Sequence, residues 1–193
     1  MAQARDFGLA GVDLVPGDHI CALYLGRRER DELVVPYLWA GLRDREKVIC
    51  IVDSPPLDDL ARVADENAVA AAVASEQLEL YQPEEAYLRV RPFTPEAMIQ
   101  FWETTVAAAV SGPYEFARAA AQMPRELQSQ PRSEFIRYEA EVNRFAPRYP
   151  QAYLCLYDLD RFGGGIVVDL LRTHPKILMG GLLLENPHYQ PPT

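Results

Sequence analysis

Histidine and cysteine are the side chains of this sequence whose pairing could support catalysis or metal binding. His19 and Cys21 are two residues apart, so on a strand they would point to the same face. Cys155 and His174 form a second pair that folding could bring together, and a thiol beside an imidazole resembles a nucleophile with its base. Nothing in the sequence activates either thiol, and two ligands alone do not make a zinc site. We therefore expect buried structural residues, with no catalytic residue, no metal ion and no cofactor.

Aspartates that follow predicted strands are a second set of candidate ligands. Asp53, Asp158 and Asp160 could hold a cation at the edge of a sheet. The same residue type also caps a helix that begins directly after a strand, and we expect this capping role here. His174 precedes Pro175, so we expect it to hydrogen-bond the backbone of a turn rather than a ligand.

The turn after the first predicted strand is the place where nucleotide-binding α/β proteins carry their phosphate loop. Such a loop needs several glycines followed by Lys and Ser or Thr. Residues 24–31 read Tyr-Leu-Gly-Arg-Arg-Glu-Arg-Asp, with one glycine, no lysine and no hydroxyl side chain except that of the tyrosine. Arg27, Arg28 and Arg30 could meet an anion, but we expect a solvated charged turn. The three glycines at 163–165 also lack a following lysine and indicate a turn.

The elements that must position these residues alternate between strands and helices. Continuous or alternating apolar runs predict strands at 19–24, 47–52, 78–81, 116–123 and 153–157 and a strand or hairpin at 177–184, whereas helical spacing predicts helices within 33–42, 54–75, 94–111, 131–146 and 166–171. Pro36 should kink the first helix or delay its start, and a connector should begin at Pro83. This alternation favours a three-layer α/β sandwich around a mostly parallel sheet. We expect a single domain over residues 1–193, with a core at about 17–185 and an irregular tail at 186–193.

Composition limits the classes of partner. The chain has 193 residues, a net charge of −9 and 49% apolar residues, which fits a globular domain and disfavours direct nucleic-acid binding. No apolar run approaches the roughly 18 residues of a membrane span, and the first residues lack a signal core, so we expect a cytoplasmic protein without membrane contact. Three cysteines, all within predicted strands, indicate reduced core thiols rather than disulfides.

Several short motifs occur in an order that resembles a known family. They are His19-Ile20-Cys21 with Tyr24, Gly41-Leu42, Tyr138-Glu139-Ala140, Cys155-Leu156-Tyr157-Asp158, Arg172-Thr173-His174-Pro175 and Asn186-Pro187-His188-Tyr189. Together they resemble the MEDS domain, the sensory domain named after methanogens, methylotrophs and the dichloromethane-response repressor. The resemblance runs from about Gly17 to Pro192. We take His19, Cys21, Asp53, Glu139 and His174 as its motif residues.

The resemblance implies a degenerate RecA/KaiC-like α/β core without a functional phosphate loop. It also implies a sensory role toward small, hydrocarbon-derived molecules. Family members often carry a DNA-binding or kinase-like output module, which we do not find here. A separate output protein is therefore an expected partner, and a second copy of the chain, as a homodimer, is another. Gln122 stands where the family commonly has an acid; it can orient a ligand but cannot accept a proton.

The binding site should lie where the strands end, because open parallel sheets bind ligands outside the carboxyl ends of their strands. We expect Tyr24, Arg118, Gln122 and Tyr157 to line one cavity for a small, mostly apolar ligand, unless these groups only cap helices and fill the sheet edge. The full set of expected ligand-binding residues is Tyr24, Arg118, Gln122, Met123, Tyr157 and Asp158.

The function expected from the sequence is a non-enzymatic sensory or regulatory module. Two alternatives stay open: a degenerate RecA-like nucleotide-binding protein, which a titration with Mg-ATP would reveal, and a pure protein-interaction domain, which the absence of a cavity would favour.

Overall fold

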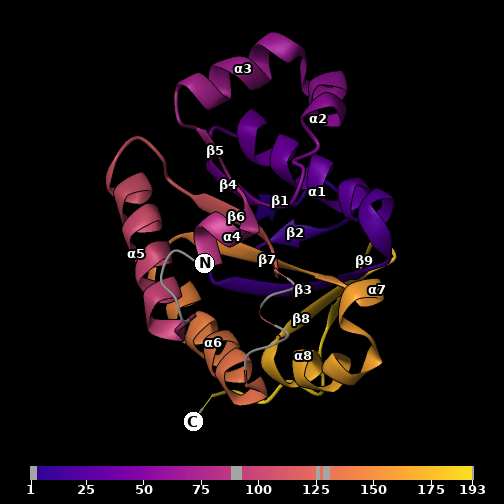
Figure 1. Ribbon diagram of the computed structural model, residues 1–193. Helices are drawn as coiled ribbons and strands as arrows, with labels where there is room; N and C mark the ends of the chain where they lie inside the picture. The colour runs from indigo at the N-terminus through magenta and orange to yellow at the C-terminus, as the bar shows by residue number, and fades with distance from the viewer. Residues whose placement is uncertain (1–3, 88–92, 125–126, 128–130, 193) are drawn as a thin grey trace.

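The fold is built on one seven-stranded sheet with the order β5-β4-β6-β7-β3-β8-β9 (Figure 1). The computed structural model describes residues 4–87, 93–124, 127 and 131–192. The strands are β3 (Asp18–Tyr24), β4 (Lys47–Ile51), β5 (Leu78–Tyr81), β6 (Ala117–Gln122), β7 (Gln151–Asp158), β8 (Lys176–Met179) and β9 (Leu182–Glu185). Every pairing is parallel except that of β9 with β8. The expected mostly parallel sheet is confirmed, with β3 and β7 as direct neighbours.

Two helical layers cover the two faces of this sheet. One layer contains α1 (Gly26–Arg43), α2 (Leu57–Ala64) and α3 (Glu66–Ala74), together with the small hairpin of β1 (Arg5–Asp6) and β2 (Asp13–Leu14). We call this side the α1 face. The other layer contains α4 (Pro83–Tyr87), α5 (Pro95–Ser111), α6 (Arg132–Phe145) and α8 (Val167–Thr173), and we call it the α6 face. Figure 1 shows the two layers on opposite sides of the strands, so the three-layer sandwich is confirmed.

Alternation along the strands decides which side chains reach which face. In β3, Ile20, Ala22 and Tyr24 pack in the core of the α1 face, whereas Cys21 and Leu23 pack in that of the α6 face. All residues of β3 and β7 are buried, as expected for strands covered on both sides.

A glycine in α1 brings this helix close to the sheet. A Cβ at Gly41 would lie 2.7 Å from the side chain of Arg118 and 2.8 Å from that of Val48. Because neither neighbour has room to move in the buried layer, a side chain at this position would separate helix and sheet. The glycine therefore permits Arg118 to lie flat beneath α1.

Two local expectations were wrong. Helix α1 begins at Gly26, directly after β3, so Pro36 lies inside it and does not delay its start; the alternative, a kink at Pro36, stays a prediction. The segment predicted as a connector from Pro83 begins with helix α4, while residues 88–92 of that segment lie outside the described residues. The region 54–75 contains two helices, in agreement with the expectation, and they are divided at Asp65, whose backbone is left-handed (φ 85°) and whose side chain caps α3.

The remaining elements are short. They are η2 (Ala146–Arg148) before β7, then α7 (Leu159–Phe162) and η3 (Gly164–Ile166) between β7 and α8. The tail from residue 186 to 192 contains no helix or strand, as expected. No described helix has both the length and the apolar character needed to span a bilayer.

Candidate functional site

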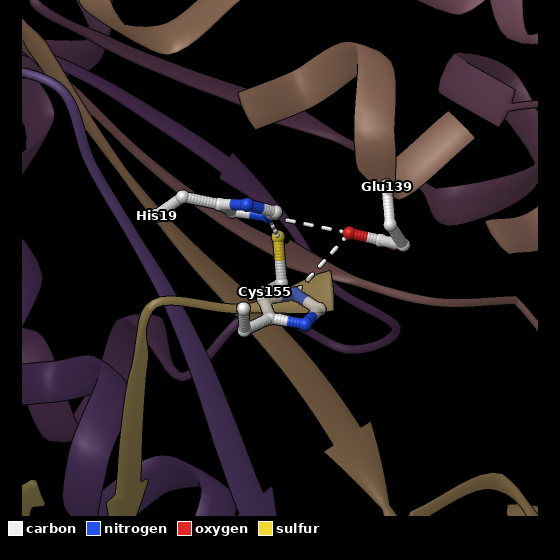
Figure 2. Close-up of side chains that lie close together, drawn as sticks. His19, Glu139 and Cys155 are labelled. Atoms are coloured by element: carbon white, nitrogen blue, oxygen red, sulfur yellow. Dashed lines mark hydrogen bonds and ion pairs between the residues drawn. The ribbon is translucent and has the colours of Figure 1, made fainter. Parts of the chain in front are cut away.

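Four side chains that can bind a metal ion meet in the core of the α6 face. His19 comes from β3, Glu139 from α6, Cys155 from β7 and His174 from the residue after α8. Their ligand atoms all lie within 4.8 Å of one another, and none of the four residues is more than 2% exposed. Figure 2 shows His19, Glu139 and Cys155 pointing toward a common centre. We call these four residues the donor cluster.

Strand register and helix spacing explain why these residues meet. Cys155 pairs with Cys21 across the sheet, so it projects from the same face as His19, which lies two residues earlier on β3. Glu139 lies in the buried stripe of α6, which also contains Phe135 and Val142. The stripe faces the sheet, and it therefore holds the carboxylate above β3 and β7.

The distances within the donor cluster are short, but two of its polar atoms have no hydrogen-bond partner among the described residues. The Oε2 atom of Glu139 lies 3.2 Å from Nε2 of His19 and 3.2 Å from Nε2 of His174. The Sγ atom of Cys155 lies 3.3 Å from Nε2 of His19. Glu139 Oε2 and His174 Nε2 have no hydrogen-bond partner among the described residues. Buried polar atoms usually have such partners, so this pair of atoms needs an explanation.

Hydrogen bonds on the outer side of each imidazole fix the position of its proton. Nδ1 of His174 lies 3.0 Å from the backbone oxygen of Leu170, which can only accept, so Nδ1 donates. Nδ1 of His19 lies 3.0 Å from Oδ1 of Asn143. The Asn143 amide nitrogen donates to the backbone oxygens of Glu139 and Thr173, so its Oδ1 accepts from His19. In a neutral imidazole the remaining Nε2 then carries a lone pair, and both Nε2 atoms face the centre of the donor cluster.

Burial controls the ionisation of these groups. Desolvation raises the pKa of the Cys155 thiol well above its usual range, and the nearby Glu139 carboxylate adds to this. Desolvation lowers the pKa of His174 below 6.5, because a charged imidazole is unfavourable in the core and beside His19. The cluster thus holds a protonated thiol at Cys155 and a neutral imidazole at His174 at neutral pH, which gives no thiolate nucleophile without an added cation.

A mostly apolar pocket lies beside the donor cluster, beyond the carboxyl end of β7. It has a volume of about 260 Å³ and lies between α6 and the segment from α7 to α8. Its lining residues are Leu127, Arg132, Phe135, Phe162, Gly165, Ile166 and Asp169. Arg132 pairs with Asp169 across one side of the pocket and donates to the backbone oxygen of Gly165. We call this feature the apolar pocket.

Tyr157 connects the apolar pocket to the donor cluster. Its ring contacts Phe135 and Phe162 edge-on, with ring centroids 6.0 and 5.9 Å apart. Its hydroxyl donates to Oε1 of Glu139. One side chain therefore contacts two pocket residues at its ring and the carboxylate of the cluster at its tip.

The α1 face carries a different buried polar group, at the carboxyl ends of β4 and β6. Arg30 is 1% exposed and donates to the backbone oxygen of Asp53 (2.7 Å), to Oε1 of Gln122 (2.8 Å), to Oδ1 of Asp31 (2.8 Å) and to the backbone oxygen of Ser54 (3.1 Å). It also pairs with the Asp53 carboxylate. We call this set the Arg30 network.

The expected solvated turn after the first strand is therefore wrong for Arg30 and correct for its neighbours. Arg27 and Arg28 are exposed and pair with Asp31 and Glu32 one helical turn later. Arg30 projects from the inner side of α1 instead, where carboxylate and amide groups of β4 and β6 receive it.

The four residues expected to line one cavity do not come together. Tyr24 and Gln122 lie on the α1 face, near the carboxyl edge. Tyr157 lies on the opposite face, because it is one residue out of phase with Asp158, the partner of Tyr24 in the sheet register. Arg118 lies four residues before Gln122, pairs with the buried Glu46 and donates to the backbone oxygen of Tyr37. The position of Tyr157 and the depth of Arg118 rule out a shared cavity.

The other predicted site residues have separate places. Met123 and Cys21 pack in the core of the α6 face. Asp158 caps α7, as expected, and also pairs with Arg161. Asp53 does not cap a helix; it pairs with Arg30 and Arg161. His174 hydrogen-bonds the backbone, as expected, but its second nitrogen faces Glu139 in the donor cluster.

Sequence reasoning considered His19, Cys155 and His174 in pairs and missed that Glu139 joins them. The signal was present in part, since the buried stripe of α6 includes a glutamate at a position otherwise held by apolar residues. A carboxylate in such a stripe needs a partner in the core.

Comparison with known proteins gives the family. The model of the MEDS family, described as the methanogen/methylotroph, DcmR sensory domain, matches residues 18–175, which include the whole donor cluster. The transcriptional repressor DcmR of Methylorubrum extorquens is 27% identical over 168 residues, which are 86% of this chain and 61% of the repressor. The chain thus spans less than two thirds of the length of that relative. Because the family model covers most of the chain, the protein belongs to the MEDS family of sensory domains.

Proposed function

We propose that this chain is a single sensory domain of a transcription-regulating system, that it binds a small, mostly apolar and hydrocarbon-derived molecule in the apolar pocket, and that it signals through a partner protein. Family membership and the similarity to a transcriptional repressor support the regulatory part. The observation that carries the binding part is the apolar pocket itself, with four large apolar side chains in its lining. No catalytic step is part of this proposal.

The size of the apolar pocket suits a ligand of a few heavy atoms. Its volume of about 260 Å³ lies just below the range of roughly 300–1,000 Å³ typical of sites for drug-sized molecules. Leu127, Phe135, Phe162 and Ile166 supply apolar contacts, and the Arg132–Asp169 pair supplies polar atoms at one side. Such a lining favours a small molecule with one polar or polarisable group.

The position of the apolar pocket also suits signalling. Its walls belong to α6 and to the segment from α7 to α8, which Arg132 joins through Asp169 and the backbone of Gly165. A molecule that enters between these walls changes contacts that both elements share. A partner that recognises the surface of either element would then bind the occupied and the empty forms differently.

The test is ligand-detected NMR with the purified chain and a panel of chloromethanes, one- to four-carbon alcohols and toluene. Gly165 lines the pocket, and a Cβ there meets no atom within 4 Å, so we expect Gly165→Leu to fold and to occupy part of the pocket. Gly164→Leu is the matched control, because a Cβ at Gly164 is equally free and this residue is not part of the lining. We expect Gly165→Leu to weaken binding at least tenfold and Gly164→Leu to leave it unchanged. The proposal fails if no compound of the panel binds, or if both variants bind like the wild type.

A nucleotide-binding function has no comparable support. Helix α1 begins at Gly26, directly after β3, and Arg30, the cation nearest to the carboxyl ends of β4 and β6, is occupied by Asp53 and Gln122. Calorimetry with Mg-ATP distinguishes the two functions, since the sensory proposal expects no heat of binding at micromolar nucleotide.

A further inference from the structure

At the centre of the donor cluster, more lone pairs than hydrogen atoms are available for hydrogen bonds. Nε2 of His19, Nε2 of His174 and Oε2 of Glu139 all direct lone pairs at the same small volume, because the outer hydrogen bonds hold the imidazole protons at Nδ1. The Cys155 thiol can donate its proton to His19. Glu139 Oε2 and His174 Nε2 are then two acceptors 3.2 Å apart, fully buried and without a partner among the described residues. Such a pair of atoms requires a positive charge between them, which either a proton or a metal ion can supply.

Three contacts in the donor cluster have nearly the spacing of ligand atoms around a tetrahedral metal ion, and all four ligand atoms lie within 4.8 Å of one another. Zinc bonds of about 2.0 to 2.3 Å place neighbouring ligand atoms of a tetrahedron about 3.3 to 3.8 Å apart. The contacts of Glu139 with the two histidines are 3.2 Å, and that of Cys155 with His19 is 3.3 Å. We infer that His19, Glu139, Cys155 and His174 bind one divalent transition-metal ion of the zinc type.

The chemistry of the donor set selects this class of ion. Two imidazoles, one thiolate and one carboxylate are ligands of Zn²⁺ and of similar transition metals, whereas Mg²⁺ and Ca²⁺ require oxygen ligands. Binding releases the Cys155 thiol proton to solvent, so two anionic ligands balance the two charges of the ion. The occupied site is then neutral, which a fully buried position in the core requires.

An outer shell of hydrogen bonds orients three of the four ligands. Asn143 holds His19, the Leu170 backbone oxygen and Thr173 hold His174, and Tyr157 holds Oε1 of Glu139. This leaves Oε2 of Glu139 as the atom directed at the ion. Metal sites carry such outer hydrogen bonds because they fix the tautomer and direction of each ligand.

The site is also close to a route from solvent. Asn143 and Thr173 line a surface cavity of about 390 Å³ beneath the C-terminal tail. The same Asn143 donates its hydrogen bonds within the outer shell, so a single layer of polar side chains separates this cavity from His19. Rotation of that side chain would open a polar path for the ion.

The test begins with the purified full chain. Its metal content is measured by atomic emission before and after dialysis against a strong chelator, and the metal-free protein is then titrated with Co²⁺. We expect one Co²⁺ per chain, a thiolate-to-cobalt charge-transfer band, intense visible bands typical of a tetrahedral site, and displacement of cobalt by Zn²⁺.

Matched variants assign the site. Cys155→Ala should abolish the charge-transfer band, whereas Cys50→Ala should retain it, because Cys50 is an equally buried thiol that packs on the α1 face. Glu139→Gln keeps the size of the side chain and should weaken Co²⁺ binding at least tenfold by removing the anionic ligand. Circular dichroism of each metal-free variant shows whether it has folded.

Three results would overturn the inference. They are a folded wild-type chain that takes up no stoichiometric Co²⁺, a charge-transfer band that survives Cys155→Ala, and Co²⁺ affinity unchanged in Glu139→Gln. If Cys155→Ala does not fold, the Glu139→Gln titration decides alone, together with proton release: one proton per Zn²⁺ bound by the wild type supports the thiolate ligand, and none contradicts it.

Discussion

The two faces of the sheet each bury a polar group, and the two groups differ in how completely their own chain satisfies them. In the Arg30 network every guanidinium nitrogen donates to an oxygen of the chain, among them those of Asp31, Asp53 and Gln122. In the donor cluster the acceptors of Glu139 and His174 meet each other without a hydrogen between them. The hydrogen-bond donors of Arg30 are satisfied within the chain, whereas the acceptors of Glu139 and His174 need a further positive charge between them.

This difference also bears on the face of the sheet at which a ligand can bind. Open α/β sheets bind ligands at the carboxyl ends of their strands. Here Arg30 fills that position between β4 and β6 on the α1 face. The apolar pocket and the donor cluster instead lie on the α6 face, where Tyr157 connects them. The α1 face thus uses this position for contacts within the chain, whereas the α6 face carries the pocket and the cluster to which we assign binding.

The largest expected effect is loss of the Arg30 network. Arg30→Leu removes the donor to the Gln122 amide oxygen and to the backbone oxygens of Asp53 and Ser54. It should lower the free energy of unfolding by about 3–5 kcal/mol, because each buried acceptor left without a partner costs about 1–3 kcal/mol. Urea denaturation measures this. Arg28→Leu is the control, because Arg28 is 93% exposed and its removal should change stability by no more than about 0.5 kcal/mol. Equal effects of the two variants would show that the network is not structural.

The next effect separates the two faces directly. Zn²⁺ at 100 times its dissociation constant should stabilise the metal-free wild type by about 2.7 kcal/mol, since it binds only the folded state. Arg30→Leu should retain this gain, because Arg30 lies on the opposite face from the donor cluster. Glu139→Gln, whose affinity should fall at least tenfold, should lose about half of the gain or more. The same urea experiment with and without Zn²⁺ provides the measurement. A gain that disappears in Arg30→Leu would mean that the faces are coupled.

The sequence predicts the frame of this molecule better than its polar interior. Continuous apolar runs locate β3, β4 and β7, because a strand covered on both sides needs such residues along its whole length. The order of short motifs was also enough to indicate the MEDS family, which the family model confirms. These features depend on local sequence, so they can be recognised without tertiary contacts.

The polar interior depends on contacts between distant segments. Arg30 stands in a run of charges typical of solvent, and only its contacts with Asp53 and Gln122 reveal that it is buried. The donor cluster combines four segments separated by as many as 155 residues, between His19 and His174 (174 − 19). Sheet order and the rotation of α6 decide that meeting, and neither follows from spacing along the chain. Tyr157 was assigned to the wrong face because it shares a strand end, not a strand phase, with Tyr24 and Gln122.

A smaller effect tests the connection between the apolar pocket and the donor cluster. Tyr157→Phe removes the hydroxyl that donates to Glu139, so it should cost about 1–3 kcal/mol of stability in the metal-free protein. It should also weaken Co²⁺ binding about 10- to 100-fold, as removal of outer hydrogen bonds usually does. Tyr153→Phe is the matched control on the same strand and face; its hydroxyl donates to Gln151, so it should affect stability but not cobalt affinity. Equal cobalt affinities in both variants would remove Tyr157 from the outer shell.

The smallest expected effect is an acid sensitivity that belongs to the α1 face. Burial alone would raise the pKa of Asp53, but Arg161, Gln122 and Arg30 outweigh it and lower the pKa below 3.8. A carboxyl group with a depressed folded-state pKa stabilises the fold above its unfolded value, and this contribution is lost as the pH falls through the folded value. The wild type should therefore lose this contribution as the pH falls below about 4. Because the Asp53 carboxylate is 36% exposed, solvent screening should keep the loss below about 1 kcal/mol.

Asp53→Asn should reduce the loss of stability at acid pH, because the variant has no carboxylate at this position to protonate. Urea midpoints of the metal-free chain at about pH 5, 4 and 3 would show a smaller decline in the variant than in the wild type. Asp13→Asn, at an exposed residue of the small hairpin, is the control and should decline like the wild type. The difference in pH dependence between Asp53→Asn and the wild type reports the contribution of Asp53 on the α1 face, because the histidines of the α6 face are the same in both proteins. An unchanged slope would mean that Arg30 and Arg161 stabilise the Asp53 carboxylate no better than water does. The contrast between the Arg30 network and the donor cluster would then depend on the guanidinium of Arg30 alone.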